Sequence, residues 1–295
     1  IILSASGMDS GAVFAATAIS ACLGTLIMAF CSNYPFVLAP GMGLNAFFAY
    51  TVVGQMGYSW QVALGAVFLE GIIFLILSLT KVREAIFNCI PPAIKFGVSG
   101  GIGLFIAFIG MQSSKLVIDG PTLVTIYPFK AALASGEFWS TGIGAVLAVF
   151  GVLITAIFLT KRVPGAILWG ILVTWFAGIG CELTGIYVPN PQLGMFSVLP
   201  DFSKGISIPS LAPTFMQMDF SDLLSFNYLT IMISFMFVDL FDTLGTLIGV
   251  ASKANMLDAY GRLPRIRGAL LADSIATAGG AILGTSTVTT FVESS

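Results

Sequence analysis

Long apolar stretches, separated by short polar connections, make up most of the chain. Each consists mainly of Ala, Leu, Ile, Val, Phe and Gly and ends at a charge, a proline or a polar turn. The seven clearest stretches cover residues 11–32, 58–79, 96–112, 141–160, 163–180, 227–250 and 267–284. A helix needs about 20 mostly apolar residues to cross roughly 30 Å of hydrocarbon. The pattern therefore predicts seven membrane-spanning helices.

Two further apolar stretches are interrupted where a continuous helix would be expected. Residues 35–53 begin PFVLAPGMGLNAFFAY, and residues 284–295 have the sequence GTSTVTTFVESS. Pro and Gly break the first, and the Thr and Val of the second favour an extended strand. Paired interruptions in separate parts of a chain are typical of transporters built from inverted repeats, in which broken helices meet near the membrane midplane. We expect these two segments to meet in the same way.

Composition agrees with a membrane protein. Of 295 residues, 57% are hydrophobic and 9% are charged, none is histidine, and the mean hydropathy is +1.00. Soluble chains carry roughly 25% charged residues, which cover their surface. The net charge of −2, without a basic patch, excludes a nucleic-acid partner. Because the four cysteines are scattered and histidine is absent, we expect neither a metal site nor a cofactor.

Basic residues predict the orientation. Nine of the twelve fall in three connections that lie two crossings apart: Lys81, Arg83, Lys95, Lys161, Arg162, Lys253, Arg262, Arg265 and Arg267. The positive-inside rule places these connections in the cytoplasm and the polar stretch 181–226 outside the cell. The chain starts without methionine and stops soon after an apolar stretch. We therefore expect an internal piece of a longer, multi-pass plasma-membrane protein.

Five carboxylates lie within or against apolar segments: Glu70, Asp239, Asp242, Asp273 and Glu293. A charge at the bilayer centre costs at least about 2.5 kcal/mol, so such residues usually face a cavity or a partner. The spacing of Asp239, Asp242, Thr243 and Thr246 is i, i+3, i+4, i+7, which predicts one shared helix face. The alternative is hydrogen bonding to neighbouring helices. Two acids three residues apart favour a functional face, since both need neutralisation or water.

Other polar residues allow two interpretations. Glu70 is equally compatible with a structural hydrogen bond through a protonated carboxyl and with a functional role. Asp273, with Ser274 and Thr277, is equally compatible with bracing the adjacent interrupted segment and with a functional role. Asn45 follows PGMGL, where extended backbone is expected to give way to helix. We expect Asn45, Glu293 and the Asp239/Asp242 face to converge on one pocket, because irregular backbone at membrane depth is tolerated where it lines a cavity.

Several long motifs resemble one family. The runs are NYPFVLAPGMGLNAFFAY, SWQVALGAVFLEGIIF, FVDLFDTLGTLIGVA and ALLADSIATAGGAILGTSTVTTFVES. They are similar to the AzgA-like branch of the nucleobase–cation symporter 2 family, the adenine/guanine/hypoxanthine permeases. The resemblance implies an all-α polytopic fold of two inverted seven-segment repeats, with short strands in broken segments three and ten. The chain would cover segments two to ten.

The resemblance also implies domains and site residues. It assigns residues 1–80 and 225–295 to a substrate-holding core domain, and 90–200 to a gate domain that supports a homodimer. It makes Asn45, Asp239, Asp242 and Glu293 the polar binding and coupling residues. The stretch DTLGT resembles the EHIGH-type motif of the uracil branch, which puts Thr246 where those relatives have histidine. Phe47, with Phe48 and Phe241, is a candidate to stack on the substrate ring.

The implied function is import of purine nucleobases by proton symport. A carboxylate accepts hydrogen bonds from adjacent N–H groups, and an Asn amide both donates and accepts, which suits the edge of a purine. Without histidine, the proton would have to use a carboxylate, so Asp239, Asp242 and Glu293 are the coupling candidates. The expected partners are a purine base, a proton and the lipid bilayer.

Four alternatives remain. The same fold transports uracil or xanthine, or an anion; an anion site wants basic residues, whereas the candidate pocket holds three acids and no basic residue. An intramembrane aspartyl protease needs two facing carboxylates that share a proton, and Asp239 and Asp242 lie side by side without a GxGD stretch. A non-transporting channel or receptor fits the paired interruptions less well. We therefore expect a transporter and not an enzyme.

Overall fold

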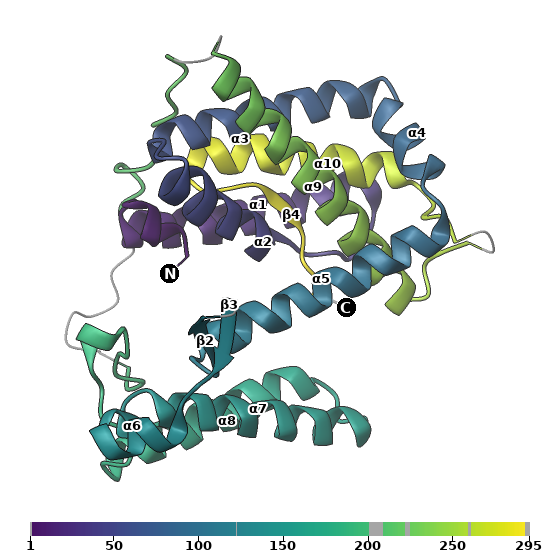
Figure 1. The fold of residues 1–295 in the computed structure, drawn as a ribbon. Coiled ribbons are helices and arrows are strands. Elements are labelled where there is room, and N and C mark those ends of the chain that lie inside the picture. Colours follow the sequence, from purple (N-terminus) through teal and green to yellow (C-terminus); the bar gives the residue numbers. More distant parts are fainter. Residues whose placement is uncertain (1, 122, 201–208, 222–224, 259–260, 293–295) are drawn as a thin grey trace. The chain divides into compact units, whose positions relative to one another are not determined.

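The computed structural model describes residues 2–121, 123–200, 209–221, 225–258 and 261–292 (Figure 1). Seven of the helices described are long and apolar enough to cross a membrane. They are α1 (Ser10–Ser32), α3 (Trp60–Leu79), α5 (Pro92–Ser113), α7 (Gly142–Thr160), α8 (Ala166–Leu183), α9 (Phe226–Lys253) and α10 (Ile266–Leu283). Each coincides with a predicted span, so this prediction is confirmed.

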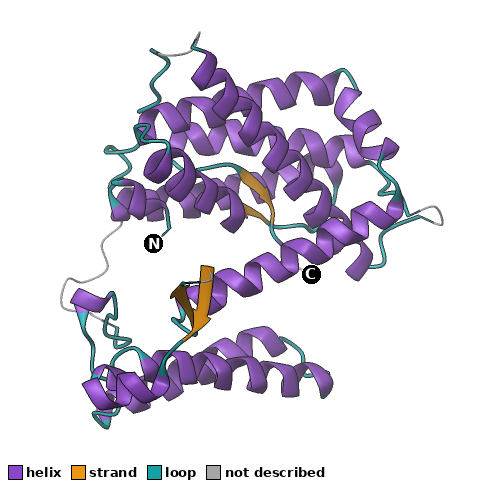
Figure 2. Cartoon of the chain, viewed as in Figure 1, coloured by secondary structure: helices purple, strands orange, loops and turns teal. Residues whose placement is uncertain are grey.

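Shorter elements connect these helices (Figure 2). The strands are β1 (Leu38–Pro40), β2 (Val117–Gly120), β3 (Leu123–Ile126) and β4 (Val288–Thr290). The short helices are η1 (Leu3–Ser6), α2 (Met42–Ala46), the π-helix η2 (Phe47–Gln55), α4 (Val82–Cys89), α6 (Phe129–Ser135), η3 (Glu137–Trp139) and η4 (Pro191–Leu193). Helix α4 and the β2–β3 hairpin fall in stretches for which the hydropathy pattern predicted no element.

Polar residues start three of the long helices. The side chains of Asp9, Ser59 and Ser225 accept hydrogen bonds from backbone N–H groups in the first turns of α1, α3 and α9. Such N-caps satisfy donors that have no partner within the helix. The polar turns that ended the apolar stretches in the sequence therefore also fix where the helices begin.

The chain divides into two compact units, residues 1–105 with 208–295 (unit 1) and residues 106–207 (unit 2). Helix α4 and the first part of α5 belong to unit 1. The core domain (1–80 and 225–295) and the gate domain (90–200) stay predictions, because they are defined by roles in transport.

In unit 1, helix α10 packs along both α1 and α3 (Figure 1). The helices approach closely at Gly71, where an added Cβ would lie 2.7 Å from the backbone nitrogen of Ala278. Small residues let helix backbones come together inside a membrane. This close packing places the polar side chains of α3 and α10 within reach of each other.

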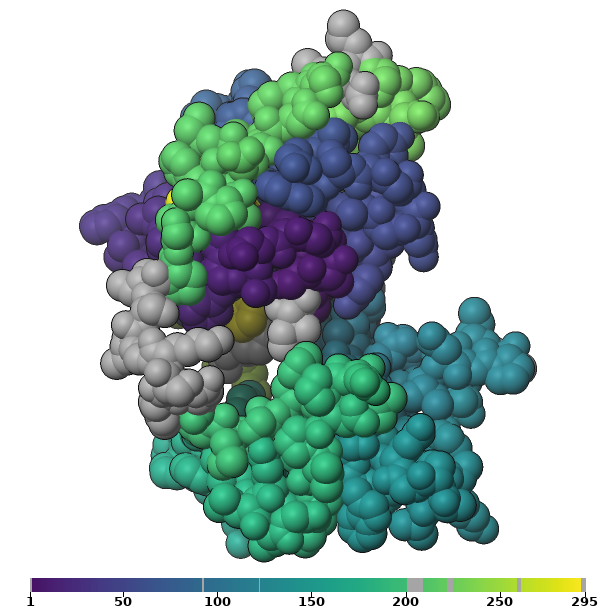
Figure 3. Space-filling view, turned by 90° about the vertical axis from the view of Figure 1, so that its left-hand side faces the viewer, coloured from purple at the N-terminus to yellow at the C-terminus, as the bar shows by residue number. Residues whose placement is uncertain are grey.

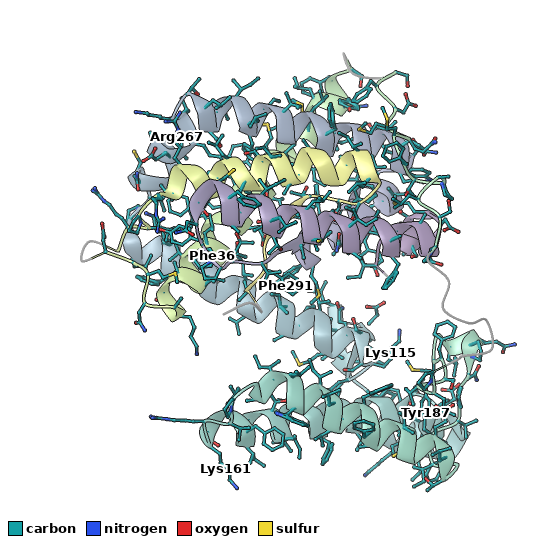
Figure 4. All side chains as sticks on the ribbon, turned by 180° about the vertical axis from the view of Figure 1, so that it is seen from behind. Phe36, Lys115, Lys161, Tyr187, Arg267 and Phe291 are labelled. Carbon is teal, nitrogen blue, oxygen red and sulfur yellow. The ribbon has the colours of Figure 1, made fainter. Side chains whose placement is uncertain are left out.

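The two interrupted segments meet in unit 1. Strands β1 and β4 pair antiparallel, with Leu38 opposite Thr290 and Pro40 opposite Val288. The backbone N–H of Phe291 donates to the carbonyl of Val37 at 2.8 Å, which extends the pairing (Phe291 is labelled in Figure 4). The pairing of the two strands provides hydrogen-bond partners for backbone N–H and C=O groups, which the hydrocarbon of a membrane cannot provide. The prediction of short strands in both segments is confirmed.

The loop 209–221 belongs to the light green part of the surface of unit 1 in Figure 3. The Met216 N–H donates to the carbonyl of Ile282, and the Asp219 N–H donates to that of Gln61. The loop thereby ties α10 to the start of α3. In unit 2, α7 packs on α8, and the Thr155 hydroxyl lies against Gly170.

Candidate functional site

The first interrupted segment changes from strand to helix at Gly41. This glycine is the N-cap of α2, and its N–H donates to the carbonyl of Thr287 in the second segment at 3.2 Å. An added Cβ at Gly41 would lie 3.0 Å from the Thr289 methyl group and 3.3 Å from Asp242 Oδ2. The absence of a side chain here therefore lets three elements, α2, β4 and α9, meet closely.

Asn45 links the two interrupted segments. It lies on α2, its amide nitrogen is 3.5 Å from the Pro40 carbonyl, and its side-chain oxygen accepts a hydrogen bond from the Ser286 hydroxyl. The predicted change from extended backbone to helix before Asn45 is confirmed by the bounds of β1 and α2. In this structure the amide holds the second segment against the first.

A cavity of about 660 Å³ lies beside this crossing. Its walls come from α2, η2, the first part of α5, and α9, all within unit 1. The lining residues are Gly43, Ala46, Phe47, Tyr50, Thr51, Val98, Ile102, Phe105, Phe237, Val238, Phe241 and Asp242. Pockets for small ligands are typically mostly apolar, with a few polar groups that fix orientation. This cavity has that character, with Asp242 as its acidic group.

One aromatic ring of the cavity, that of Phe47, is packed against a buried ring of the protein. The Phe47 ring meets Phe235 edge-on, with centroids 4.9 Å apart and an interplanar angle of 85°. Phe235 is fully buried, whereas Phe47 is half-buried and lines the cavity. A ring held in this way offers a flat apolar surface to a ligand without first having to be ordered.

A second feature of unit 1 is a buried charge group, which consists of Arg83 on α4, Asp239 on α9 and Asp273 on α10. The guanidinium of Arg83, on α4, is 2.8 Å from Asp273 Oδ2 on α10 and 3.5 Å from Asp239 Oδ2 on α9. Arg83 also donates to the Leu270 carbonyl and the Ser274 hydroxyl. Both aspartates are 0% exposed and Arg83 is 2% exposed. One cation thus holds two buried acids from neighbouring helices.

Thr243 completes this group. Its hydroxyl lies 3.0 Å from Asp239 Oδ1, 3.3 Å from Asp273 Oδ2 and 3.0 Å from the Thr289 hydroxyl on β4. One hydroxyl has a single proton to donate, so it serves one of the two carboxylates at a time, and the Thr289 hydroxyl can donate to it. The charge group is therefore joined directly to the second interrupted segment.

The predicted single face of α9 divides in two. Asp239 and Thr243 turn toward Arg83, Asp242 lines the cavity, and Thr246 donates to the carbonyl of Asp242 at 2.8 Å within the helix. From the predicted residues, the cavity therefore brings together Phe47, Phe241 and Asp242. The lining does not include Asn45, Phe48, Asp239 or Thr246, which were expected at the same pocket. Glu293 lies outside the described residues.

One expectation needs correction. The candidate acids were expected to have no basic neighbour, whereas Arg83 pairs with Asp239. Arg83 lies in the connection between α3 and α5, where the sequence placed it, but on the short helix α4 its side chain is buried. A long side chain on a short helix can reach inward as easily as outward. The pattern Lys81-Val82-Arg83 gave no sign of the direction.

Asp273, with Ser274 and Thr277, was expected to brace the interrupted segment or to act functionally. Thr277 makes such a bracing contact, since its hydroxyl donates to the Val288 carbonyl at 3.0 Å. Asp273 interacts with the Thr289 hydroxyl on β4 and also pairs with Arg83. The signal for Asp273 was available in the sequence as an acid within an apolar span. Arg83 was the residue that sequence reasoning missed.

The comparisons with known proteins give consistent results. The family model described as "Permease family" (Xan_ur_permease) matches residues 1–295. The chain is 49% identical over 294 residues to a putative permease of Methanocaldococcus jannaschii, covering 99% of this chain and 62% of that protein. It is 45% identical to the guanine/hypoxanthine permease PbuG of Bacillus subtilis (98% and 60% covered) and 36% identical to the adenine permease AdeQ of Escherichia coli (99% and 60% covered).

These relatives are longer than the chain, which spans about 60% of their length. Among solved structures, the transmembrane domain of the cyanobacterial bicarbonate transporter BicA has a TM-score of 0.55 at 13% identity, covering 97% of this chain and 74% of that one. At this identity the likeness concerns the fold alone. The resemblance to purine permeases found in the motifs is confirmed by the sequence matches. This chain, with its seven apolar helices, therefore belongs to the permease family and to the multi-pass proteins of the cell membrane.

Proposed function

We propose that the complete protein imports purine nucleobases, such as adenine, guanine and hypoxanthine, together with protons. The observation that carries the proposal is the cavity beside the crossing of the interrupted segments, with apolar rings on its walls and one carboxylate, Asp242. A purine is flat and carries N–H donors on its edge, which fits ring faces and a carboxylate acceptor. The printed names of relatives such as PbuG and AdeQ support the same substrate class.

In this proposal the roles of the predicted residues are divided. Asp242 accepts from the base, and Phe47 and Phe241 face its ring. Asn45 holds the two interrupted segments together beside the bound base, and Thr246 shapes the helix that carries Asp242. Asp239 belongs to the coupling machinery through its pair with Arg83. Glu293 keeps its proposed role in binding and coupling.

Unit 1 acts in this proposal as the core domain that binds substrate. Unit 2 forms part of the gate domain, through which two copies associate. The acid-lined cavity disfavours the anion alternative, since its described lining contains no Lys or Arg and an anion site is built from basic groups or unopposed helix N-termini.

The test is uptake of radiolabelled hypoxanthine by cells that express the full-length protein. We expect Asp242→Asn to lower uptake by about 10–100-fold, because a hydrogen bond to a charged group contributes roughly 1.5–3 kcal/mol. Asp119→Asn is the matched control, because Asp119 is an exposed acid in unit 2.

Competition by unlabelled compounds defines the substrate class. Adenine and guanine are expected to compete, whereas uracil, sulfate and bicarbonate are not. Unchanged uptake in Asp242→Asn would remove Asp242 from the binding site. Competition by sulfate as strong as that by adenine would replace the purine proposal by the anion alternative.

A further inference from the structure

Glu70 is a fully buried acid with an unsatisfied oxygen. It lies in the middle of α3 and is 0% exposed. Its Oε2 accepts a hydrogen bond from the Thr287 hydroxyl at 3.2 Å, but Oε1 has no hydrogen-bond partner among the described residues. Burying a charged oxygen without a partner is strongly unfavourable, and a buried group usually takes up a proton instead. The surroundings of Glu70 therefore favour its neutral form.

The two nearby acids also disfavour an ionised Glu70, whereas Arg83 acts against them. The charged groups that act on Glu70 from neighbouring helices are Asp239 on α9, Asp273 on α10 and Arg83 on α4. Arg83 already pairs with both aspartates, and no ion pair joins it to Glu70 in the part of the chain that the structure describes. Three ionised acids against one cation would leave two uncompensated negative charges in the interior. Glu70, which has the fewest partners, is the acid best placed to hold a proton.

Glu70 is also connected to the cavity. Thr287 contacts Glu70 through its hydroxyl, and its carbonyl accepts from the N–H of Gly41. Gly41 starts α2 and lies against Asp242, the acid of the cavity. A change at Glu70 therefore acts on the crossing of the two interrupted segments through one residue, Thr287.

We propose that Glu70 binds and releases the transported proton, and that Thr287 transmits its charge state to the crossing beside Asp242. This inference rests on the proposed proton symport and adds a residue to it. Proton binding forms an O–H bond on a carboxylate oxygen of Glu70 and neutralises the side chain. Release breaks that bond, passes the proton to water, and leaves a carboxylate that draws the Thr287 hydroxyl toward it. An ionised Glu70 is disfavoured in the closed protein because its charge is fully buried and is repelled by the buried Asp239.

A proton fits this position better than a metal ion does. Among the described residues, no group of three or more acidic or cysteine side chains is arranged to hold a metal ion. Sodium would need several oxygen ligands around Glu70, where the structure provides the Thr287 hydroxyl as hydrogen-bond partner. The experiment below includes sodium as a separate condition.

The test uses the full-length protein in liposomes that contain a pH-sensitive dye. Addition of hypoxanthine to wild-type vesicles is expected to acidify the lumen. The Glu70→Gln side chain is permanently neutral. This variant is expected to exchange hypoxanthine at a rate within about twofold of wild type, while its proton flux falls at least about tenfold. Glu137→Gln, an exposed acid in unit 2, is expected to behave like wild type in both assays.

A second variant keeps the acid. Thr287→Val removes the donor that stabilises the ionised form of Glu70, so the midpoint of the pH dependence of uptake is expected to move to higher pH. This measurement decides the question if Glu70→Gln does not reach the membrane. An unmoved midpoint in that case would overturn the inference.

The outcomes separate this inference from the proposed function. If wild-type protein carries hypoxanthine without acidification, proton symport fails and the role of Glu70 fails with it. If wild type is coupled and Glu70→Gln is coupled equally, the role of Glu70 alone is overturned. If replacing sodium by choline abolishes uptake at constant pH, the coupling ion is sodium and the inference is wrong.

Discussion

Helices α10 and α7 show how differently two membrane-spanning helices are used in this chain. The most apolar 18-residue stretch of α10, in unit 1, has a mean hydropathy of 1.3, and 61% of this stretch is buried. Helix α7, in unit 2, has a hydropathy of 2.6, and 17% is buried. Helix α3 is as apolar as α7, at 2.5, yet 56% of it is buried. Mean hydropathy therefore finds the spans without telling which of them the protein buries.

Small and ionisable residues distinguish the two groups better. Helix α3 carries Glu70 and Gly71, and α10 carries Asp273 among buried Ala, Ser and Thr. Helix α7 carries no acidic or basic residue between Gly142 and Thr160. An ionisable side chain inside a span needs a partner, and a small one lets a partner approach. The polar centre of unit 1 is where these two needs are met together.

Removal of Arg83 is expected to lower the stability of unit 1 more than the other substitutions described below. Arg83→Ala leaves Asp239 and Asp273 buried without their cation, which costs about 3–5 kcal/mol in measured cases. The measurement is thermal unfolding of the full-length protein in detergent. Arg267→Ala is the control, because Arg267 is exposed and donates to the Leu79 carbonyl on the same unit; Arg267 is labelled in Figure 4. Equal stability of the two variants would show that the charge group contributes little to unit 1.

A pair of glycine substitutions is expected to give effects of opposite sign. Gly71→Ala would place a methyl group 2.7 Å from the Ala278 backbone, and such overpacking costs roughly 1–3 kcal/mol. Gly144→Ala, on α7, meets no atom within 4 Å and is expected to stabilise the helix by about 0.5–1 kcal/mol. Unfolding temperatures check both. A stabilising Gly71→Ala would contradict the close packing of α3 on α10.

The smallest expected effect concerns a threonine hydroxyl. Thr243→Val removes hydrogen bonds to Asp239, Asp273 and Thr289, and bonds between membrane helices contribute about 0.6–1.7 kcal/mol. Thr160→Val removes a bond within the exposed end of α7, so no measurable change in unfolding temperature is expected. If both variants unfold like wild type, the Thr243 hydroxyl adds no stability to the charge group.

Much of the fold was predictable because lipid imposes a simple rule on the backbone. A span needs a long apolar helix, and an interruption needs partners for its free backbone groups. Those two requirements predicted the seven long helices and the meeting of the interrupted segments 35–53 and 284–295. Short strands in both segments were implied by the family resemblance, and their bounds come from the structure. Helix α4 was not predictable in this way, because it has only eight residues and carries charges that are typical of a loop.

The site was predictable in its residue types and less so in their directions. Asp239 and Asp242 are three positions apart, which turns them about 60° from each other around the helix axis. That angle is small enough to suggest one face, yet it suffices to send Asp239 toward Arg83 and Asp242 into the cavity. Which neighbour occupies each direction depends on packing between distant segments, and no local spacing records it.

The pairing of β1 with β4 has a consequence for biosynthesis. Pro40 and Val288 are partners although roughly 250 residues separate them. A ribosome delivers the chain from its N-terminus, so β1 is made long before the strand that satisfies its backbone groups. Until β4 emerges, the unpaired backbone groups of β1 need other hydrogen-bond partners, which water, other nascent helices or the insertion machinery can provide. We expect unit 1 to mature late in synthesis, after the helices of unit 2 have already entered the bilayer.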